Sequence, residues 1–306
     1  MIQLNVKDEF SPLREVVLGT PRSLGDVPKL EEAYDPKSKE HILKGTYPGE
    51  DDIRKEMSAF NEVLVKYGVK VYRPEVINNY NQIFARDIAF VIDDKFVITN
   101  MLEDRQREIE ALDHVLKDIP DSQILRMPED AKLEGGDIMP LEGHIFLGYS
   151  KKEDFEKYTV ARTNEEGLEF VKKTFPNRKV VGFELRKSDT DPRDNALHLD
   201  CCFQPLGRGF CILYPGGFKN QDDVEFIRRF FGTDKCIEIN REEMYQMNSN
   251  VFSISPEVVV SEKGFTRLNS VLRENGFTVE EIPYAETAKM EGLLRCSTLP
   301  LVRDNN

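Results

Sequence analysis

The chain has 306 residues, 40% of them hydrophobic, and its 42 Lys and Arg stand against 55 Asp and Glu, which gives a net charge of −13 at pH 7. Such a chain can bury a large core and is not intrinsically disordered. The negative charge and the lack of a basic block disfavour nucleic acids and anionic membranes as partners, and no segment resembles a membrane span or a secretory signal. We therefore expect a cytoplasmic globular protein.

The first predicted element is an amphipathic helix followed by a strand. Apolar side chains recur at helical spacing from Ile53 to Tyr67, Gly68 ends the run, and the alternating segment VKVYRP follows as a strand. The same order of helix, Gly or Pro break and short strand recurs at 112–128, 168–185, 224–239 and 268–283. Five copies at intervals of roughly fifty residues indicate a repeat architecture, so we expect a single α/β domain over residues 1–306.

An irregular loop and a predicted β-hairpin follow four of the five repeats. The hairpins are predicted at 88–99, 137–149, 197–214 and 250–261. The fifth loop leads instead to Cys296 and a last strand, whose free partner is the segment REVVLG near the N-terminus. Pairing of the two chain ends would leave no open edge. The predicted fold is a five-fold pseudosymmetric α/β propeller whose ring is closed by its N-terminal and C-terminal strands.

Unusual polar residues lie at equivalent points of the repeat, where each loop meets its hairpin or the last strand. In a cyclic arrangement equivalent positions converge on one axis, so five distant segments would place these side chains in one central pocket. The residues are Asp87, Glu134, His198 with Asp200, Asn248 and Cys296. His198 and Asp200 are two positions apart, which would put both side chains on one face of a strand.

Each of these residues also has a purely structural explanation. Asp87 could form a surface ion pair with Arg86, and the glycines of EGGD at 134–137 could supply the positive φ of a turn. His198 could be a core histidine, and Cys296 could be a buried thiol. Their shared position in the repeat favours a functional cluster over four unrelated explanations.

The groups in this cluster suit a small cationic guanidino substrate. The carboxylates of Asp87 and Asp200 could bind the planar fork of guanidinium donors. Cys296 could then attack the guanidinium carbon to give a covalent thiouronium, with His198 as general acid and base. Glu134 would orient the imidazole, and the bound cation would favour the thiolate form of the cysteine.

The cysteine pattern argues against a metal centre. The five cysteines form no CxxC pair and are odd in number, which disfavours both a disulfide framework and structural zinc; they are Cys201, Cys202, Cys211, Cys236 and Cys296. His198 and Cys201 would begin a metal site, but a second pair at ligand spacing is missing. We expect no metal and no cofactor, and apolar roles for the four inner cysteines.

Across nearly the whole chain, from SPLREVVLG to RCSTLPLVRD, the sequence resembles the guanidino-group-modifying enzymes. It resembles the arginine deiminases most, through NQIFARD, EGGD, HLD and RCSTLPLVR. The resemblance implies the five-fold propeller known as the pentein fold. The roles that it implies are nucleophile for Cys296, general acid and base for His198, charged partner for Glu134, and guanidinium clamps for Asp87 and Asp200.

The resemblance also implies further substrate contacts. Arg162 in ARTN resembles the arginine that binds a substrate carboxylate, and Arg105 or Arg107 in MLEDRQRE resembles a second such residue. Asn81, the first residue of NQIFARD, is a further expected substrate contact. We expect the loops at 22–50 and 151–161 to read the tail of the substrate.

Several reactions stay open at this point. Hydrolysis of arginine to citrulline and ammonia is the expected reaction. The alternatives are double hydrolysis to ornithine, hydrolysis of dimethylarginine, and amidino transfer to an amine. A binding ring without catalytic activity is not favoured. The resemblance implies that Asp200 favours an unmethylated guanidinium, because dimethylarginine hydrolases usually lack this aspartate. It also implies that EGGD favours water over an amine as acceptor, because amidinotransferases usually carry a different, aspartate-containing segment there. Arg295 would either assist Cys296 or shield an empty site. A homo-oligomer is compatible with the sequence.

Overall fold

Five sheets of three strands make up the fold. The computed structural model describes residues 1–304, and in each sheet of these residues a central strand is antiparallel to one neighbour and parallel to the other. The sheets are β15 (Thr298–Arg303), β1 (Leu13–Leu18) and β2 (Lys70–Tyr72); β3 (Ala89–Ile92), β4 (Lys95–Ile98) and β5 (Ile124–Arg126); β6 (Ile138–Leu141), β7 (His144–Tyr149) and β8 (Lys179–Glu184); β9 (Phe203–Pro205), β10 (Cys211–Leu213) and β11 (Cys236–Glu238); β12 (Phe252–Ser253), β13 (Val258–Glu262) and β14 (Thr278–Ile282). This repetition fits the predicted five-fold pseudosymmetry.

A helical crossover joins the central strand of each sheet to its parallel neighbour, because a tight turn cannot connect parallel strands. Four crossovers contain the predicted helices, which are α2 (Glu50–Lys66), α5 (Glu165–Thr174), α6 (Gln221–Phe231) and α8 (Thr266–Glu274). The second crossover differs from the prediction, since it consists of the 3-10 helix η2 (Glu103–Leu112) and a single turn, α3 (Asp113–Leu116). Pro120 follows that turn and disfavours its continuation. The remaining helices are α1 (Pro36–Leu43), α4 (Lys152–Lys157), α7 (Arg241–Tyr245) and α9 (Ala285–Ala288).

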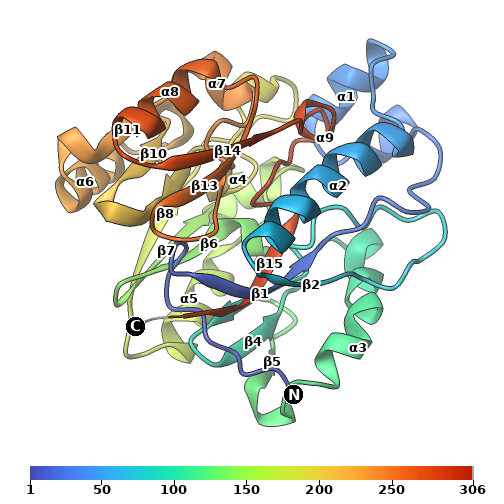
Figure 1. Ribbon diagram of the computed structural model, residues 1–306, viewed down its shortest axis with the longest axis horizontal. Coiled ribbons are helices and arrows are strands. Elements are labelled where there is room, and N and C mark those ends of the chain that lie inside the picture. Colours follow the sequence, from blue (N-terminus) through green and yellow to red (C-terminus); the bar gives the residue numbers. More distant parts are fainter. Residues whose placement is uncertain (305–306) are drawn as a thin grey trace.

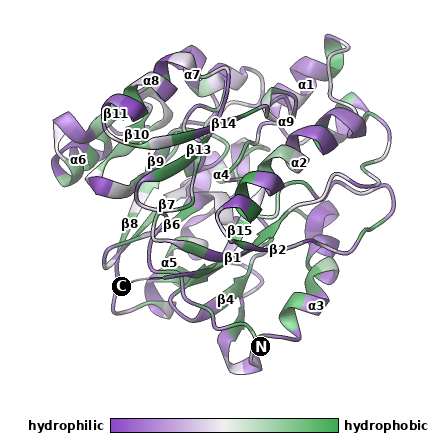
Figure 2. Cartoon of the chain, in the orientation of Figure 1, coloured by the Kyte–Doolittle hydropathy of each residue, from purple (hydrophilic) through white to green (hydrophobic). Residues whose placement is uncertain are grey.

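The crossover helices pack their apolar stripes on the sheets. In α2 the side chains of Ile53 and Phe60 are fully buried, and the Phe60 ring meets the rings of Phe252 and Tyr284 edge-on with centroids 5.8 Å apart. Figure 2 shows the apolar residues concentrated along the strands, whereas polar residues cover the outer sides of the helices. The helix predicted from Ile53 to Tyr67 is confirmed.

The two ends of the chain pair with each other, as predicted. Strand β1 is antiparallel to β15, with Val16 opposite Pro300 and Leu18 opposite Thr298. The two strands, at opposite ends of the colour scale, lie side by side in Figure 1. Because Cys296 lies just before β15, this pairing also fixes the position of the terminal cysteine.

Among residues 1–304 no helix combines the length and the apolar character that a membrane crossing requires. The single-domain organisation, the cytoplasmic location and the homo-oligomer stay predictions.

Replacement of Leu299 by Ala tests the closure of the fold. Leu299 lies on β15 opposite Val17 and is fully buried. We expect Leu299→Ala to lower the free energy of unfolding by about 3 kcal/mol, because the change leaves a cavity where the chain ends pair. Urea unfolding followed by circular dichroism measures this. Val65→Ala, on the exposed face of α2, is the control and should cost less than about 1 kcal/mol; equal effects of the two changes would contradict the account.

Candidate active site

The five loops that lead into β15, β3, β6, β9 and β12, here called the lead loops, contact one another in cyclic order. Four contacts are hydrogen bonds, from Arg86 N–H to the Cys296 carbonyl (3.0 Å), from Leu199 N–H to Asp137 Oδ1 (2.9 Å), from Ser249 Oγ to the Asp200 carbonyl (2.8 Å) and from Arg295 N–H to the Asn250 carbonyl (3.2 Å). The remaining neighbours touch at Gly135, where a Cβ would lie 2.0 Å from the Arg86 carbonyl oxygen. The equivalent segments therefore converge, as the repeat predicts.

The lead loops open into a cavity of about 990 Å³. Seven of the eight predicted site residues line it, namely Asn81, Asp87, Arg105, Glu134, Arg162, His198 and Cys296. Much of the remaining wall comes from residues 24–35, which belong to the loop predicted to read the substrate's tail. The predicted loop at 151–161 does not line this cavity.

His198 lies between two carboxylates. Its Nε2 is 2.9 Å from Glu134 Oε2, and its Nδ1 is 3.9 Å from Asp87 Oδ1. Burial opposes protonation of the imidazole, but the Asp87 charge and the hydrogen bond to Glu134 outweigh it and raise the pKa of His198 to about 9. Burial likewise opposes ionisation of Glu134, yet His198 and Arg162 lower its pKa to about 2. At neutral pH the pair is an imidazolium and a carboxylate.

The EGGD segment makes room for this histidine. Gly136 belongs to the 3-10 helix η4 (Gly135–Asp137), and a Cβ on Gly136 would lie 2.6 Å from His198 Nδ1. Neither glycine of the segment has a positive φ, so the explanation as a turn with left-handed glycines is wrong. Gly135 is required by its close contact with the Arg86 carbonyl, and Gly136 by its close contact with the His198 imidazole.

Cys296 is held by an asparagine. Asn250 Oδ1 accepts the Cys296 N–H at 3.1 Å, and Asn250 Nδ2 donates to Sγ at 3.1 Å. The sequence pattern pointed to Asn248 instead, but Asn250 stands two residues before its strand, as Cys296 and Asp87 do before theirs. Burial and the nearby charges of Asp200 and Asp87 raise the pKa of the Cys296 thiol well above its usual value. The cysteine is therefore a thiol at neutral pH.

Asp200 does not line the cavity and differs from its predicted role as a clamp. Its Oδ2 pairs with Arg295 at 2.8 Å and lies 3.6 Å from the Cys296 thiol, so the carboxylate stands behind the sulfur. His198 and Asp200 are not on a strand either, because Leu199–Cys201 forms a 3-10 turn, η6. The prediction of a shared strand face is wrong.

Arg295 neither shields the cavity nor lines it. Its guanidinium is fully buried and binds both oxygens of Glu9 at 3.0 Å, in addition to Asp200. Burial would raise the pKa of Glu9, but Arg295 and Arg86 lower it to about 2. Glu9 carries no signal in the sequence, because its partner lies at the other end of the chain.

Arg105 and Arg162 line the cavity, but protein groups already bind their guanidinium groups. Arg105 donates to Asp87 Oδ2 at 2.8 Å and to Glu108 at 2.7 Å. Arg162 donates to the carbonyls of Thr159 (2.5 Å) and Tyr34 (3.0 Å), and its Nε is 3.7 Å from Glu134. Asn81 Oδ1 accepts the N–H of Ile83, and Arg107 pairs with Glu110 outside the cavity.

Two oxygens of the central carboxylates have no hydrogen-bond partner among the described residues. They are Asp87 Oδ1 and Glu134 Oε1, and both residues are at most 4% exposed. A buried carboxylate oxygen without a donor is costly, and a cationic ligand with N–H groups would satisfy both.

A metal could in principle use the same groups. Ligand atoms of Asp87, Glu134 and His198 lie within 4.8 Å of one another. The protonated imidazole opposes this, since a ligating histidine must be neutral. The absence of a metal stays a prediction.

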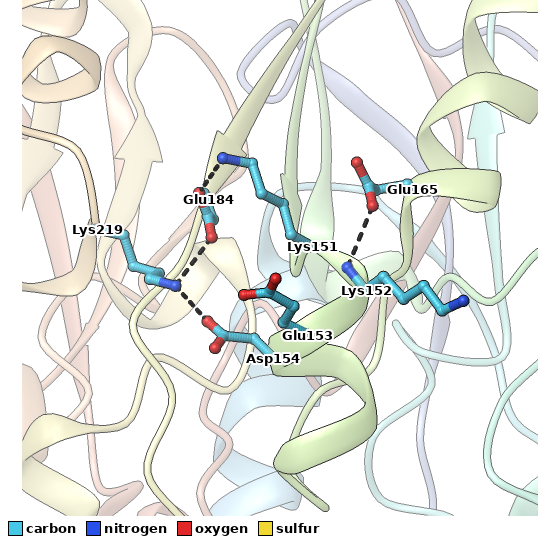
Figure 3. A pocket seen from close by; sticks show the side chains of 7 residues that line it. All are labelled: Lys151, Lys152, Glu153, Asp154, Glu165, Glu184 and Lys219. Atoms are coloured by element: carbon cyan, nitrogen blue, oxygen red, sulfur yellow. Dashed lines mark hydrogen bonds and ion pairs between the residues drawn. The ribbon is translucent and has the colours of Figure 1, made fainter.

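The segment at 151–161 lines a separate pocket of about 240 Å³. Figure 3 shows Lys219 bridging Asp154 and Glu184, with Lys151 on the same glutamate at 3.0 Å. These charges neutralise one another, and no residue of the lead loops takes part.

A family model described as "N,N dimethylarginine dimethylhydrolase, eukaryotic" matches residues 44–302. The chain belongs to this family, within the guanidino-group-modifying enzymes. The resemblance noted in the sequence is thereby confirmed at the level of the superfamily.

Relatives and solved structures agree with this membership. An uncharacterized protein of Bacillus subtilis, YkgA, is 25% identical to this chain, and the match covers 97% of this chain and 94% of YkgA. An arginine deiminase of Latilactobacillus sakei is 26% identical, and the match covers 87% of this chain and 71% of the deiminase. The N-terminal domain of ArgZ, an arginine dihydrolase from Cyanobacteria, superposes with a TM-score of 0.77 at 19% identity over 94% of this chain and 98% of its own. SxtG, an amidinotransferase from Microseira wollei, superposes with a TM-score of 0.77 at 18% identity, and the match covers 99% of this chain and 98% of SxtG. The two structural likenesses show a shared fold.

Titration of His198 by NMR tests the electrostatics of the site. The chain has 4 histidines, so their ring signals can be separated. We expect His198 to titrate near pH 9 and expect Glu134→Gln to lower that pKa, because the imidazolium loses a charged acceptor at 2.9 Å. Glu129→Gln removes an exposed charge outside the cavity and should leave the titration unchanged. An unshifted His198 in Glu134→Gln would contradict this description.

Proposed function

We propose that this protein is a cysteine hydrolase that cleaves a C–N bond of a guanidinium group through a thiouronium intermediate on Cys296. The observation that carries the proposal is the pair of unpartnered, buried carboxylate oxygens, Asp87 Oδ1 and Glu134 Oε1, in the wall that also contains Cys296 and His198. Arginine is the substrate expected from the sequence. The cyclic contacts of the lead loops also support the closed five-fold propeller as the frame of the site.

In the proposed first step, the guanidinium binds to Asp87 and Glu134. Arg105 holds Asp87 Oδ2 and leaves Oδ1 for the substrate, so the carboxylate is fixed in direction before the substrate arrives. The arriving cation lowers the pKa of Cys296, which the surrounding carboxylates otherwise raise. The thiol then releases its proton to solvent, so substrate binding generates the nucleophile.

In the second step, the thiolate bonds to the guanidinium carbon and the C–N bond to one amine breaks. His198 donates the proton that the departing amine needs, and we assign this proton to Nδ1, because Nε2 is bound to Glu134 and Nδ1 faces Asp87. Glu134 stabilises the imidazolium until that transfer.

In the third step, neutral His198 takes a proton from a water molecule, whose oxygen bonds to the same carbon. The C–S bond then breaks, the ureido product leaves, and Cys296 and His198 return to their starting charges. The balance is one guanidinium and one water converted to one ureido compound and one ammonium, or a substituted ammonium.

Methylated arginines return as candidates. The sequence argument against them rested on Asp200 as a clamp, and Asp200 lies outside the cavity wall. The family model carries dimethylarginine in its description, which supports including this compound in any substrate test. Amidino transfer is the alternative outcome of the same test.

Product analysis with guanidino compounds tests the proposal. With arginine, agmatine or N,N-dimethylarginine as the only substrate, we expect ammonia or dimethylamine together with a ureido product. Cys296→Ser should lower turnover at least about 1,000-fold, because the nucleophile is lost. Cys236→Ser, which lies outside the cavity, is the control. Turnover that appears only after an acceptor amine is added would instead establish transfer, and full turnover by Cys296→Ser would refute both reactions.

Alkylation of Cys296 tests the role of the cation. Chloroacetamidine carries a positive amidinium, whereas chloroacetamide is neutral and of similar size. We expect chloroacetamidine to label Cys296 at least about 100-fold faster at neutral pH, because its charge binds Asp87 and lowers the thiol pKa. Labelling by chloroacetamide should increase as the pH rises, since the thiol pKa is raised in the free protein. Peptide mass spectrometry reads both rates.

Asp87→Asn supplies the control for this comparison. The variant keeps the size of the side chain and removes the charge, so it should abolish most of the advantage of chloroacetamidine. Equal labelling rates for the two reagents in the unmodified protein would contradict activation by the bound cation.

A further inference from the structure

A buried lysine binds the main chain just before His198. Lys187 follows β8 in the chain, is 6% exposed and lies outside the lining of the cavity. Its ammonium donates to the carbonyl of Ala196 at 2.8 Å and to that of Leu197 at 2.7 Å. These are the two residues directly before His198, so a positive charge holds the segment that leads to the imidazole.

The main chain after His198 is held by a buried aspartate. Asp137 is fully buried, and its Oδ1 accepts the N–H of Leu199 at 2.9 Å. Its Oδ2 accepts the hydroxyl of Thr163 at 2.6 Å, which fixes the direction of the carboxyl group. A Cβ on Gly148 would lie 2.4 Å from Oδ1, so the glycine at that position leaves room for the carboxyl group. Both peptide groups that flank His198 are therefore bonded to buried side chains.

Closure of the loop at 187–195 does not by itself require a charge at Lys187. The backbone already closes this loop, because the N–H of Ala196 donates to the carbonyl of Arg186 at 2.9 Å. An ammonium is costly to bury, and burial lowers the pKa of Lys187 although the nearby charge of Asp137 opposes this. A charged donor forms stronger hydrogen bonds than a neutral one. The buried charge therefore suits a segment whose position must be tightly fixed.

The role proposed for His198 depends on the direction of its ring. Nε2 has to stay at Glu134, 2.9 Å away, while Nδ1 gives and takes protons on the side of Asp87. A displacement of about 1 Å at a reacting group can lower turnover about 100-fold. Main-chain bonds on both sides of the residue restrict such a displacement.

We propose that Lys187 and Asp137 are positioning residues for His198. They hold the main chain on both sides of the imidazole and thereby keep Nε2 at Glu134 and Nδ1 facing Asp87. The inference rests on the proposed function for its effect on turnover, whereas the orientation of the imidazole can be measured without any substrate.

Titration of His198 by NMR in the Lys187→Met variant tests the inference. Methionine fills a similar space but has no ammonium, so both carbonyls lose their donor. We expect the pKa of His198, which is raised to about 9, to fall by at least about 1, because a displaced imidazole loses its short bond to Glu134. The carboxylates that raise this pKa, Asp87, Glu134 and Asp137, all remain in the variant. Loss of a nearby positive charge alone would raise the pKa, so a fall reports lost positioning.

Lys37→Met is the matched control. Lys37 is another buried lysine outside the cavity lining, and its ammonium donates to the carbonyl of Tyr245 instead of the segment before His198. The change removes the same charge and should not lower the pKa of His198. An unchanged or raised pKa in folded Lys187→Met, or an equal fall in Lys37→Met, would overturn the inference. If Lys187→Met does not fold, Lys187→Gln decides by the same shift, because its amide is uncharged and one bond shorter.

Turnover gives a second reading of the same variant. With a guanidino compound that the product analysis identifies as a substrate, Lys187→Met should lower kcat at least about tenfold and change KM less than about threefold, because the imidazole acts after the substrate has bound. An unchanged kcat, or a change confined to KM, would overturn the inference.

The two proposals fail in different ways. If no guanidino compound is turned over, the proposed function fails, and the titration still decides whether Lys187 positions His198. Normal turnover with an unshifted titration in Lys187→Met would leave the proposed function standing and refute the positioning role.

Discussion

The rest of the structure depends on one buried guanidinium. Arg295 is fully buried and joins Glu9, near the N-terminus, to Asp200 in another lead loop, directly beside Cys296. A charge removed from water is costly unless it is completely paired, so neither carboxylate can be absent without penalty. Pairing of β1 with β15 brings the two ends of the chain together, and the Glu9–Arg295 ion pair links the same two ends. The position of the Cys296 sulfur is thus linked to the pairing of the chain ends.

In the proposed mechanism, the chemistry follows from three buried carboxylates near that sulfur, Asp87, Glu134 and Asp200. In the free protein these carboxylates keep His198 as an imidazolium and Cys296 as a thiol, so an acid is ready but a nucleophile is not. In the proposed mechanism, a guanidinium ion bound at Asp87 lowers the pKa of the Cys296 thiol. We therefore expect the carboxylates that bind the substrate to keep Cys296 protonated in the empty site, where it would react slowly with neutral electrophiles. We expect charge as well as shape to decide which molecules activate the cysteine.

Periodicity in the sequence was sufficient to predict the parts of the fold that repeat. The helix from Ile53 to Tyr67, the pairing of the chain ends and the convergence of the lead loops all follow from local patterns that recur. Contacts between distant segments were not predictable in this way. Asp200 has a carboxylate that could bind a guanidinium, but in the structure this carboxylate pairs with Arg295. The EGGD segment needs glycine because of close contacts that exist only once the loops are assembled. The short 3-10 turn at HLD likewise replaces the expected strand because Leu199 bonds to Asp137 of the preceding loop.

The central claim is that Cys296 carries the substrate's guanidinium carbon during turnover. Acid quenching of the working enzyme, followed by proteolysis and mass spectrometry of the peptide that contains Cys296, tests this most directly. The account predicts that a fraction of this peptide carries the amidine carbon of the substrate. A substrate that is consumed at a measurable rate while the Cys296 peptide stays unmodified, or an adduct found on another cysteine, would contradict the account.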